Sequence, residues 1–216
     1  MASGKAYFKF FGVALLIIAI DQLTKMLVHF NMEYGLAGQI KIFDDWFKLH
    51  YTLNPGMAFG LEIGGNYGKL WLTLFRMAAM GGISYYLYSI IKQRLHPGYI
   101  LCVSLILGGA IGNLIDSIFY GVWLNNAPAD VPTPWFHGQV VDMIFVDIWE
   151  GMLPERLPII GGQWYSFWPI FNIADASIFC GVFTIIIFQN KFFKENGSEK
   201  GESHHHKNSS STSSST

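Results

Sequence analysis

Four apolar runs, each about 20 residues long, constrain the fold of this chain more than any other feature. A helix of about 20 residues can cross the hydrocarbon core of a bilayer, because each residue adds about 1.5 Å. Of the 216 residues, 51% are hydrophobic and only 13% are charged, which is typical of a membrane protein. The sequence therefore predicts an all-α integral membrane protein, a bundle of four transmembrane helices over residues 8–30, 70–91, 99–120 and 168–189.

The distribution of basic residues predicts the orientation of these helices, since lysine and arginine are retained on the cytoplasmic side. With four spans, one side of the membrane holds Lys5, Lys9, Lys92, Arg94, Lys191, Lys194, Lys200 and Lys207. The other side holds Lys41, Lys48 and Arg156. We therefore expect both termini in the cytoplasm and residues 31–67 and 121–167 on the outer side.

The two outer segments contain the β-like patterns of the chain. Residues 47–53 (FKLHYTL) alternate as a short strand does, and residues 138–142 (GQVVD) form a second strand-like piece. We expect a small extracytoplasmic β-like cradle and, over residues 121–167, a long loop that covers or shapes a site. Residues 1–194 are expected to form a single membrane-embedded domain, and the Ser-, Thr- and Lys-rich residues 195–216 a disordered tail.

An acid lies inside the last apolar run, at Asp175 within residues 168–177 (WPIFNIADAS). An ionised aspartate in hydrocarbon costs at least about 2.5–3.5 kcal/mol, so intramembrane acids usually face a bundle interior and carry function. Asn172 lies three residues upstream, on the same helical face. The alternative is that Asp175 only caps or pairs structurally.

Other polar residues reach the same depth. At about 1.5 Å per residue, Asp116 lies about 26 Å from the inner end of its span, and Asp175 and Arg76 each about 10 Å below the outer end of theirs. Asn113 and Asn172 lie within a turn of this level, and Asn54 and Asp142 come from the outer segments just above it. The sequence predicts a polar cluster near the outer boundary of the membrane.

Several kinds of chemistry have no support in the sequence. Ser104, Ser117 and Ser177 have no lysine or histidine at a helical spacing that would activate them. The histidines lack metal-ligand spacing, and Cys102 and Cys180 fall in apolar runs as small hydrophobic residues. We expect no cofactor, no metal and, without a basic cluster, no nucleic-acid partner.

Paired carboxyl groups remain as candidate catalysts. Two carboxylates at hydrogen-bonding distance cannot both ionise, so the charged one can activate water while the protonated one polarises a carbonyl. Asp116, Asp142 and Asp175 all qualify by depth, which leaves the identity of the pair open at this point. Asp21 and Lys25, spaced i, i+4, favour a structural ion pair. Gly108 and Gly112 form a GxxxG pattern that permits close helix contact.

Five motifs in order resemble those of lipoprotein signal peptidase, the signal peptidase II family, over residues 8–190. They are Asp21-Gln22-x-Thr24-Lys25, Asn54-x-Gly56-x-Ala58-Phe59, Gly112-Asn113-x-x-Asp116, Val140-Val141-Asp142 and Phe171-Asn172-x-Ala174-Asp175. The resemblance implies an aspartyl endopeptidase of the bacterial inner membrane that removes signal peptides from prolipoproteins whose cysteine carries diacylglycerol. It also implies contact with membrane lipid and sensitivity to globomycin, a cyclic peptide antibiotic.

The same resemblance implies the roles of individual residues. It makes Asp142 and Asp175 the catalytic pair and assigns a supporting shell to Asn54, Gly56, Asn113, Asn172 and Ala174. Asp142 also fits on physical grounds, because a strand-like piece can descend to the interface where water and an extended peptide have access. We expect Asp116 to orient this shell.

The chain departs from the family pattern in three places. Ser117 stands where an arginine usually follows the GNxxD aspartate, and Met143 where phenylalanine usually follows the VVD aspartate. The loop between Asp116 and Asp142 is longer than is typical. We expect Arg76, at the same depth, to supply the missing guanidinium.

Two other functions compete with the peptidase. A small proton- or ion-coupled transporter could use Asp116 and Asp175 as a relay, and a non-catalytic scaffold would need neither acid. A transporter should have polar residues along a path to both faces of the membrane. The inner halves of these spans are nearly free of polar residues, which favours a site that opens to one side.

Overall fold

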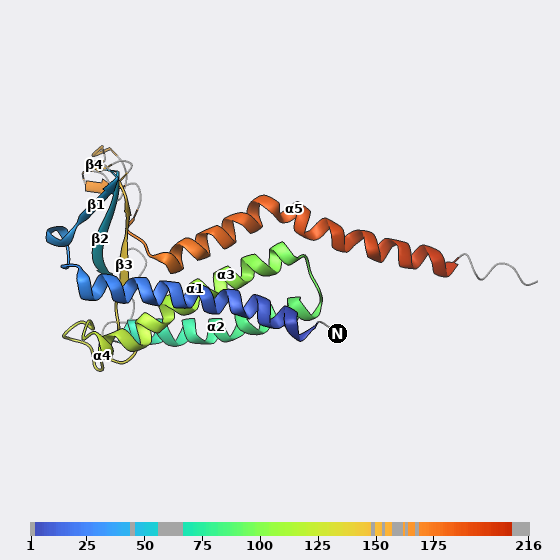
Figure 1. The fold of residues 1–216 in the computed structure, drawn as a ribbon, viewed down its shortest axis with the longest axis horizontal. Coiled ribbons are helices and arrows are strands. Elements are labelled where there is room, and N and C mark those ends of the chain that lie inside the picture. Colours follow the sequence, from blue (N-terminus) through green and yellow to red (C-terminus); the bar gives the residue numbers. More distant parts are fainter. Residues whose placement is uncertain are drawn as a thin grey trace, which may run out of the picture.

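Long helices run side by side and carry a small sheet at one end of the molecule (Figure 1). The computed structural model describes residues 3–43, 46–55, 67–147, 150–152, 154–156, 162, 164–166 and 169–208. The four long helices are α1 (Gly4–Asn31), α2 (Gly68–Lys92), α3 (Pro97–Ile115) and α5 (Ile173–Asn208). The helix of α3 continues through a π-helical turn, η4 (Asp116–Tyr120), into the short α4 (Gly121–Trp123).

Three stretches within the described residues are long and apolar enough to cross a membrane: Gly4–Asn31, Pro97–Trp123 and Ile173–Phe193. They correspond to three of the four predicted spans. The second predicted span is helical as α2 but is not among these three stretches, so its membrane crossing stays a prediction.

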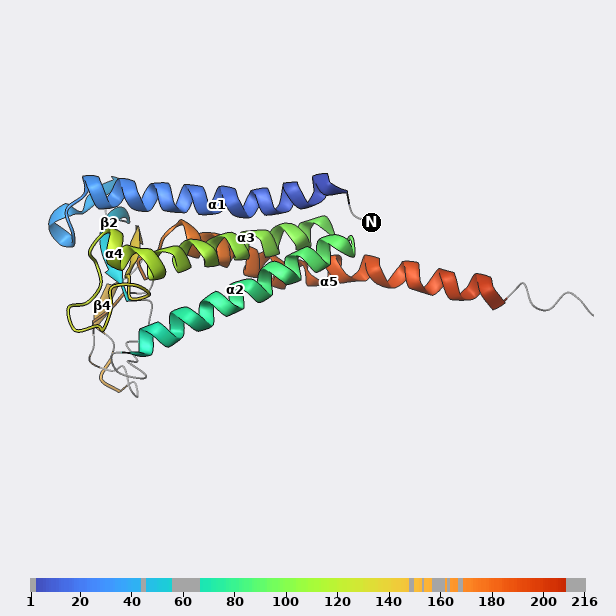
Figure 2. The same cartoon turned by 90° about the horizontal axis from the view of Figure 1, so that it is seen from below.

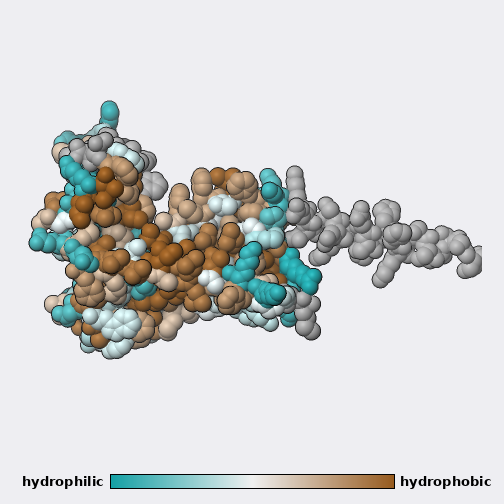
Figure 3. Space-filling model, viewed as in Figure 1, coloured by the Kyte–Doolittle hydropathy of each residue, from teal (hydrophilic) through white to brown (hydrophobic). Residues whose placement is uncertain are grey.

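Large apolar side chains cover the outside of the helices. Brown, hydrophobic residues lie over the middle of the bundle, between more hydrophilic ends (Figure 3). The large apolar side chains that are more than half exposed on the helices include Phe8, Leu15, Phe75, Phe183 and Ile186. Exposed apolar surface of this extent is typical of a membrane-contacting protein.

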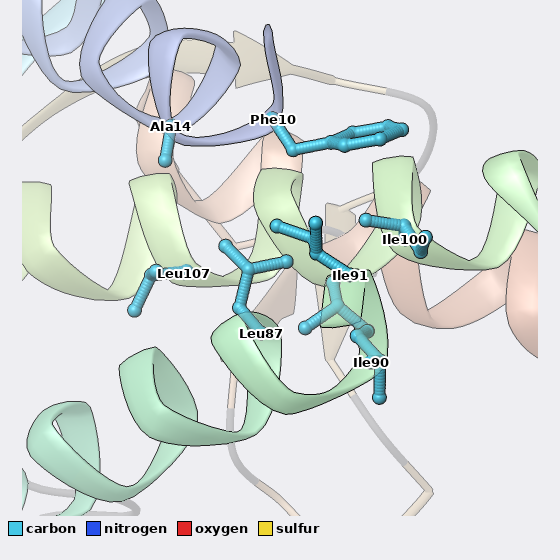
Figure 4. Close-up of a cluster of buried hydrophobic side chains, with 8 residues drawn as sticks. Phe10, Ala14, Leu87, Ile90, Ile91, Ile100 and Leu107 are labelled. Carbon is cyan, nitrogen blue, oxygen red and sulfur yellow. The ribbon is translucent and has the colours of Figure 1, made fainter. Parts of the chain in front are cut away.

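The interior of the bundle is held by an aliphatic cluster at the end where the chain begins. Leu87, Ile90 and Ile91 of α2 meet residues of α1 and α3 there (Figure 4). At the opposite end, Val28 of α1 packs with Tyr51, Tyr120, Val141 and Met143 and joins the helices to the sheet.

The predicted β-like cradle is a three-stranded antiparallel sheet, in the order β1 (Ile40–Phe43), β2 (Phe47–Asn54) and β3 (Val140–Val146). Its register pairs Thr52 with Asp142. A separate bridge between Ile144 and Phe171 ties β3 to the segment that leads into α5. The sheet thus brings residues from three distant parts of the sequence to the same end of the bundle. A short 3-10 turn, η1 (Leu36–Gly38), precedes this sheet, and β4 (Glu150–Met152) pairs with β5 (Trp164–Ser166) beside it.

The GxxxG pattern has the consequence that the sequence predicts. A Cβ atom at Gly108 would lie 2.8 Å from the backbone oxygen of Ala14 on α1, and one at Gly112 would lie 2.6 Å from a carboxylate oxygen of Asp21. α1 can therefore approach α3 closely enough for its polar side chains to reach across.

The last helix differs from its predicted range at both ends. α5 begins at Ile173 rather than at residue 168, because Asn172 caps it and Pro169 lies in the non-helical segment before it. Asp175 therefore lies in the first turn of α5, not about 10 Å inside the helix. At the other end α5 continues to Asn208, into the segment whose composition predicts disorder, since an established helix gains a hydrogen bond with each added residue.

Candidate active site

Asp142 lies on β3 with only 1% of its surface exposed. One of its carboxyl oxygens, Oδ2, accepts a hydrogen bond from Asn54 Nδ2 over 3.0 Å. The other, Oδ1, accepts from Asn172 Nδ2 over 2.6 Å. Two amides, one from β2 and one from the start of α5, therefore fix the position of this carboxyl group.

Asp175 forms a reciprocal cap with Asn172 at the start of α5. The backbone N–H of Asp175 donates to Asn172 Oδ1 over 2.9 Å, and the backbone N–H of Asn172 donates to Asp175 Oδ2 over 3.3 Å. This is the capping-box arrangement, with aspartate in the place usually taken by glutamate. Asp175 therefore has the capping role that the sequence left open as an alternative. This role uses its carboxyl oxygen Oδ2, while Oδ1 faces Asn113.

A chain of amides connects the two carboxyl groups. Asn113 of α3 donates to Asp175 Oδ1 over 2.8 Å, and its own Oδ1 accepts from Asn172 Nδ2 over 3.1 Å. Asn172 is fully buried and contacts both acids. The pair is therefore held in place by two asparagines whose donors and acceptors are already engaged.

The electrostatic environment sets the protonation of Asp142. Burial raises the pKa of Asp142 to about 7, with a further upward contribution from the negative charge of Asp175. The hydrogen bonds from Asn54 and Asn172 and the charge of Lys25 act in the opposite direction but do not cancel the effect of burial. Near neutral pH this carboxyl group can either hold or release a proton, as a general acid or base must.

A second cluster lies directly behind the pair, around the buried ammonium group of Lys25. Lys25 Nζ lies 2.8 Å from Asp21 Oδ2 and 2.7 Å from Asp116 Oδ2, and none of the three side chains is exposed. It also donates to Asn113 Oδ1 over 2.9 Å. The structural pair predicted between Asp21 and Lys25 is thus one edge of a larger network that includes Asp116.

This network joins the helices to the sheet. Asp21 Oδ1 accepts from the backbone N–H of Ala174 over 2.9 Å, and Asp116 Oδ2 from the backbone N–H of Val141 over 3.4 Å. Ala174 and Val141 each precede one of the two candidate catalytic acids. The Lys25 cluster therefore positions the backbone on which those acids stand.

Three other positions discussed from the sequence are Arg76, Ser117 and Gly56. Arg76 lies on α2, and the charge of Asp175 acts on its guanidinium group. Ser117 donates its hydroxyl to the backbone oxygen of Asn113 over 3.1 Å, within its own helix. Gly56 lies outside the described residues.

Sequence reasoning missed two residues of the network. Gln22 donates to Asp116 Oδ1 over 2.8 Å and accepts from the hydroxyl of Tyr120 over 3.0 Å. Tyr120 is fully buried at the end of η4. The sequence signal for Gln22 is that an amide directly follows Asp21 within an otherwise apolar run.

The long loop after α4 is closed on itself and leads directly into β3. Asn126 and Gln139 exchange three hydrogen bonds of 2.8–3.0 Å. Gly138 lies so close to η4 that a Cβ atom there would collide with the backbone oxygen of Asp116. Asp130, the acid of this loop, is exposed.

An apolar cavity of about 670 Å³ opens beside Asp175. Asn54 and Asp175 supply its polar contacts, and the rest of its lining includes Pro169, Ile170, Phe171, Ala176, Phe179 and Cys180. The site thus combines two carboxyl groups, one of them with a raised pKa, and an apolar space that can hold a lipid or a hydrophobic peptide segment.

Comparisons with known proteins place this geometry in context. The family profile for signal peptidase (SPase) II matches residues 13–191. A lipoprotein signal peptidase of Amoebophilus asiaticus is 48% identical over 184 residues, covering 85% of this chain and 78% of the relative. One of Porphyromonas gingivalis is 39% identical over 187 residues, covering 82% of this chain and 80% of the relative. A solved bacterial membrane enzyme matches with a TM-score of 0.55 and 26% identity, over 83% of this chain and 90% of its own.

Proposed function

Because this chain belongs to the signal peptidase II family, we propose that it is an aspartyl endopeptidase that removes the signal peptide from bacterial prolipoproteins. The bond hydrolysed would be the one N-terminal to the cysteine that carries diacylglycerol. The observation that carries the proposal is the pair Asp142 and Asp175, joined by Asn113 and Asn172 beside an apolar cavity. The transporter alternative finds no support in these comparisons.

The chemistry follows from a single proton shared by the two acids. Asp142, whose pKa is raised to about 7, holds the proton and polarises the scissile carbonyl. Asp175 accepts a proton from the attacking water, and the amide hydrogen bonds keep both carboxyl groups aligned during the transfer. The proton on Asp142 is then available to the leaving amine.

The cavity beside Asp175 suits the apolar part of the substrate. Its walls are apolar except for Asn54 and Asp175, so acyl chains or a signal-peptide segment would be bound by exclusion of water. We propose that globomycin-type inhibitors occupy the same space, within reach of the catalytic pair. A competition between inhibitor and lipidated substrate would test this.

The membrane arrangement proposed here has four spans, with α2 as the fourth. Trp71 and Phe75 on α2 are each more than two-thirds exposed, as lipid-facing residues would be. Both termini would be cytoplasmic in the inner membrane, and the pair and the long loop of residues 120–139 would lie on the outer-leaflet side. A reporter fused after Lys194 should be cytoplasmic and one inserted near Asn126 external; the opposite result at either position would contradict this arrangement.

The function itself can be tested with purified protein in detergent or lipid. A diacylglyceryl-modified prolipoprotein should lose the mass of one signal peptide. The same precursor without the lipid serves as the matched control and should be cleaved far more slowly. Absence of cleavage of the lipidated precursor by folded protein would refute the proposal.

A further inference from the structure

The first turn of α2 contains a buried lysine that the proposed chemistry does not use. Lys69 is only 7% exposed, and its Nζ has no hydrogen-bond partner among the described residues. An ammonium group has three donors, and burying it without an acceptor is strongly unfavourable. Such a group is expected where a ligand supplies the missing acceptor.

The start of this helix is positive for a second reason. The capping residue, Tyr67, makes no side-chain hydrogen bond to the helix, and the first turn contains no acid. Free N–H groups at a helix N-terminus carry a partial positive charge and attract anions. Lys69 adds a full charge to that end, where helices normally place aspartate or glutamate.

The neighbourhood of Lys69 faces the active-site end of the molecule. Thr73, one turn later, is buried and donates to the backbone oxygens of Lys69 and of Phe136, over 2.9 and 3.0 Å. Phe136 in turn donates its backbone N–H to Ile118 of η4. In Figure 2, α2 begins at the end that carries the strands and diverges there from α3. Lys69 therefore lies one turn before the contact between α2 and the segment that leads into β3.

Arg76 relates this position to the catalytic pair. It follows Lys69 by seven residues, which places it on the same helical face about 10.5 Å further into the helix. The charge of Asp175 acts on Arg76, while the charges of Asp116 and Arg76 act on Lys69. An extended peptide covers about 10 Å with three residues.

We propose that Lys69 and the first turn of α2 form a subsite for a carboxylate side chain of the substrate, about three residues into its mature segment. The proposal rests on the proposed function, which puts the mature segment on this outer side of the scissile bond. A carboxylate would satisfy the ammonium group and the helix terminus together. The enzyme would thereby prefer prolipoproteins with an acid close behind the lipidated cysteine.

A lipid phosphate offers the same anionic oxygens, but Lys69 is only 7% exposed. A peptide side chain reaches a covered position more readily than a headgroup does. We therefore assign the subsite to the peptide and treat lipid binding as an outcome that the experiment separates.

The experiment compares lipidated precursors that carry aspartate or asparagine at each of the second to fifth mature positions. Wild-type enzyme should cleave the best aspartate precursor with a kcat/KM about tenfold above its asparagine partner, the effect expected for one charge-assisted hydrogen bond. Lys69→Met should reduce this ratio to below about twofold, mainly through KM. Lys92→Met, at the exposed opposite end of the same helix, should keep the wild-type ratio.

The unfolding temperature distinguishes a ligand-binding lysine from a lysine that stabilises the fold. Lys69→Met removes a buried charge that has no partner, so its unfolding temperature should equal or exceed that of the wild type. Equal cleavage of both precursor series by the wild type would overturn the proposal while leaving the proposed function intact. The proposal would also be overturned if Lys69→Met kept the preference for aspartate and differed only in that its activity no longer depended on anionic lipid in the vesicles. Absence of cleavage of every lipidated precursor would instead refute the proposed function.

Discussion

Asn172 donates its side-chain amide to Asp142 over 2.6 Å, while its side-chain oxygen caps the helix that follows. One residue thus sets the position of one candidate catalytic acid and the start of the helix that carries the other. Replacing Asn172 should therefore disturb the positions of both candidate catalytic acids while leaving the acids themselves in the protein.

We predict that Asn172→Ala lowers kcat at least about 100-fold, because displacement of catalytic groups by about 1 Å has effects of that size. The lost cap should cost about 1 kcal/mol of stability, and each buried partner left without its hydrogen bond about 1–3 kcal/mol more. The control is Asn31→Ala, which removes an exposed side chain that bonds to Leu27 of its own helix. Turnover and thermal unfolding of both variants would test this, and near-normal turnover by Asn172→Ala would contradict it.

The pH dependence of cleavage should reflect the raised pKa of Asp142. This carboxyl group is protonated below about pH 7 and ionised above it, so kcat should fall as the pH rises above about 7. Asn54→Ala removes a hydrogen bond that favours the ionised form, which should move this fall to higher pH. A rate that stays constant up to pH 9 would show that Asp142 need not hold the proton.

The same raised pKa predicts how stability changes with pH. The folded pKa of about 7 exceeds the value of about 3.9 expected for aspartate in the unfolded chain. The folded state therefore binds more protons between these values, and the stabilisation present below about pH 4 is lost as the pH rises to about 7. Asp142→Asn should reduce this dependence in unfolding measurements from pH 4 to 8.

The fully buried cluster behind the pair should be more important for stability than the partly exposed ion pair between Lys48 and Asp147. Lys25→Met leaves the carboxylates of Asp21 and Asp116 buried without their cation, at an expected cost of about 3–5 kcal/mol. The matched control, Lys48→Met, breaks a pair with Asp147 whose side chains are 12% and 20% exposed, so this variant should cost clearly less than Lys25→Met. Similar losses for both variants in thermal unfolding would argue against a structural role of the Lys25 cluster.

The long loop should act through its connection to β3 and not through its acid. Asp130 is exposed, so Asp130→Asn should keep activity within about twofold of the wild type. Asn126→Ala removes the hydrogen bonds to Gln139, one residue before β3, and should lower activity more. A loss in Asp130→Asn as large as that of a catalytic mutant would place the loop in the active site.

Much of the arrangement could be predicted because the apolar runs and the strand alternation are local signals. Residues 47–53 were expected as a strand and lie within β2. The estimated depths predict Asp116 and Asp175 at one level, with Asn113 and Asn172 within a turn of it and Asp142 just above. Hydrogen bonds join Asn113, Asn172, Asp142 and Asp175 in the structure.

Two features differ from the prediction or were not predicted: the start of α5 and the pairing of Lys25 with Asp116. The apolar residues before Asn172 predict helix from residue 168, because hydrophobicity alone does not distinguish an extended segment from a helix. Pro169 and the Asn-x-x-Asp spacing were the signals that mark the true start. The pairing of Lys25 with Asp116 depends on how closely α1 approaches α3, which the GxxxG pattern permits but does not specify.

The central claim, that Asp142 and Asp175 act as a pair sharing one proton, is tested most directly by asparagine substitutions that keep size and remove charge. Asp142→Asn and Asp175→Asn should each abolish cleavage of a diacylglyceryl prolipoprotein. Both proteins should remain folded and bind a globomycin-type peptide. Asp116→Asn should be impaired only in part, because its carboxylate contacts Lys25, Gln22 and backbone.

The decisive measurement is single-turnover cleavage by these three variants, with inhibitor binding recorded on the same samples. We expect no product from Asp142→Asn or Asp175→Asn and a measurable rate from Asp116→Asn. Cleavage by Asp142→Asn, together with a folded, inhibitor-binding but inactive Asp116→Asn, would contradict the account and identify Asp116 as the partner of Asp175.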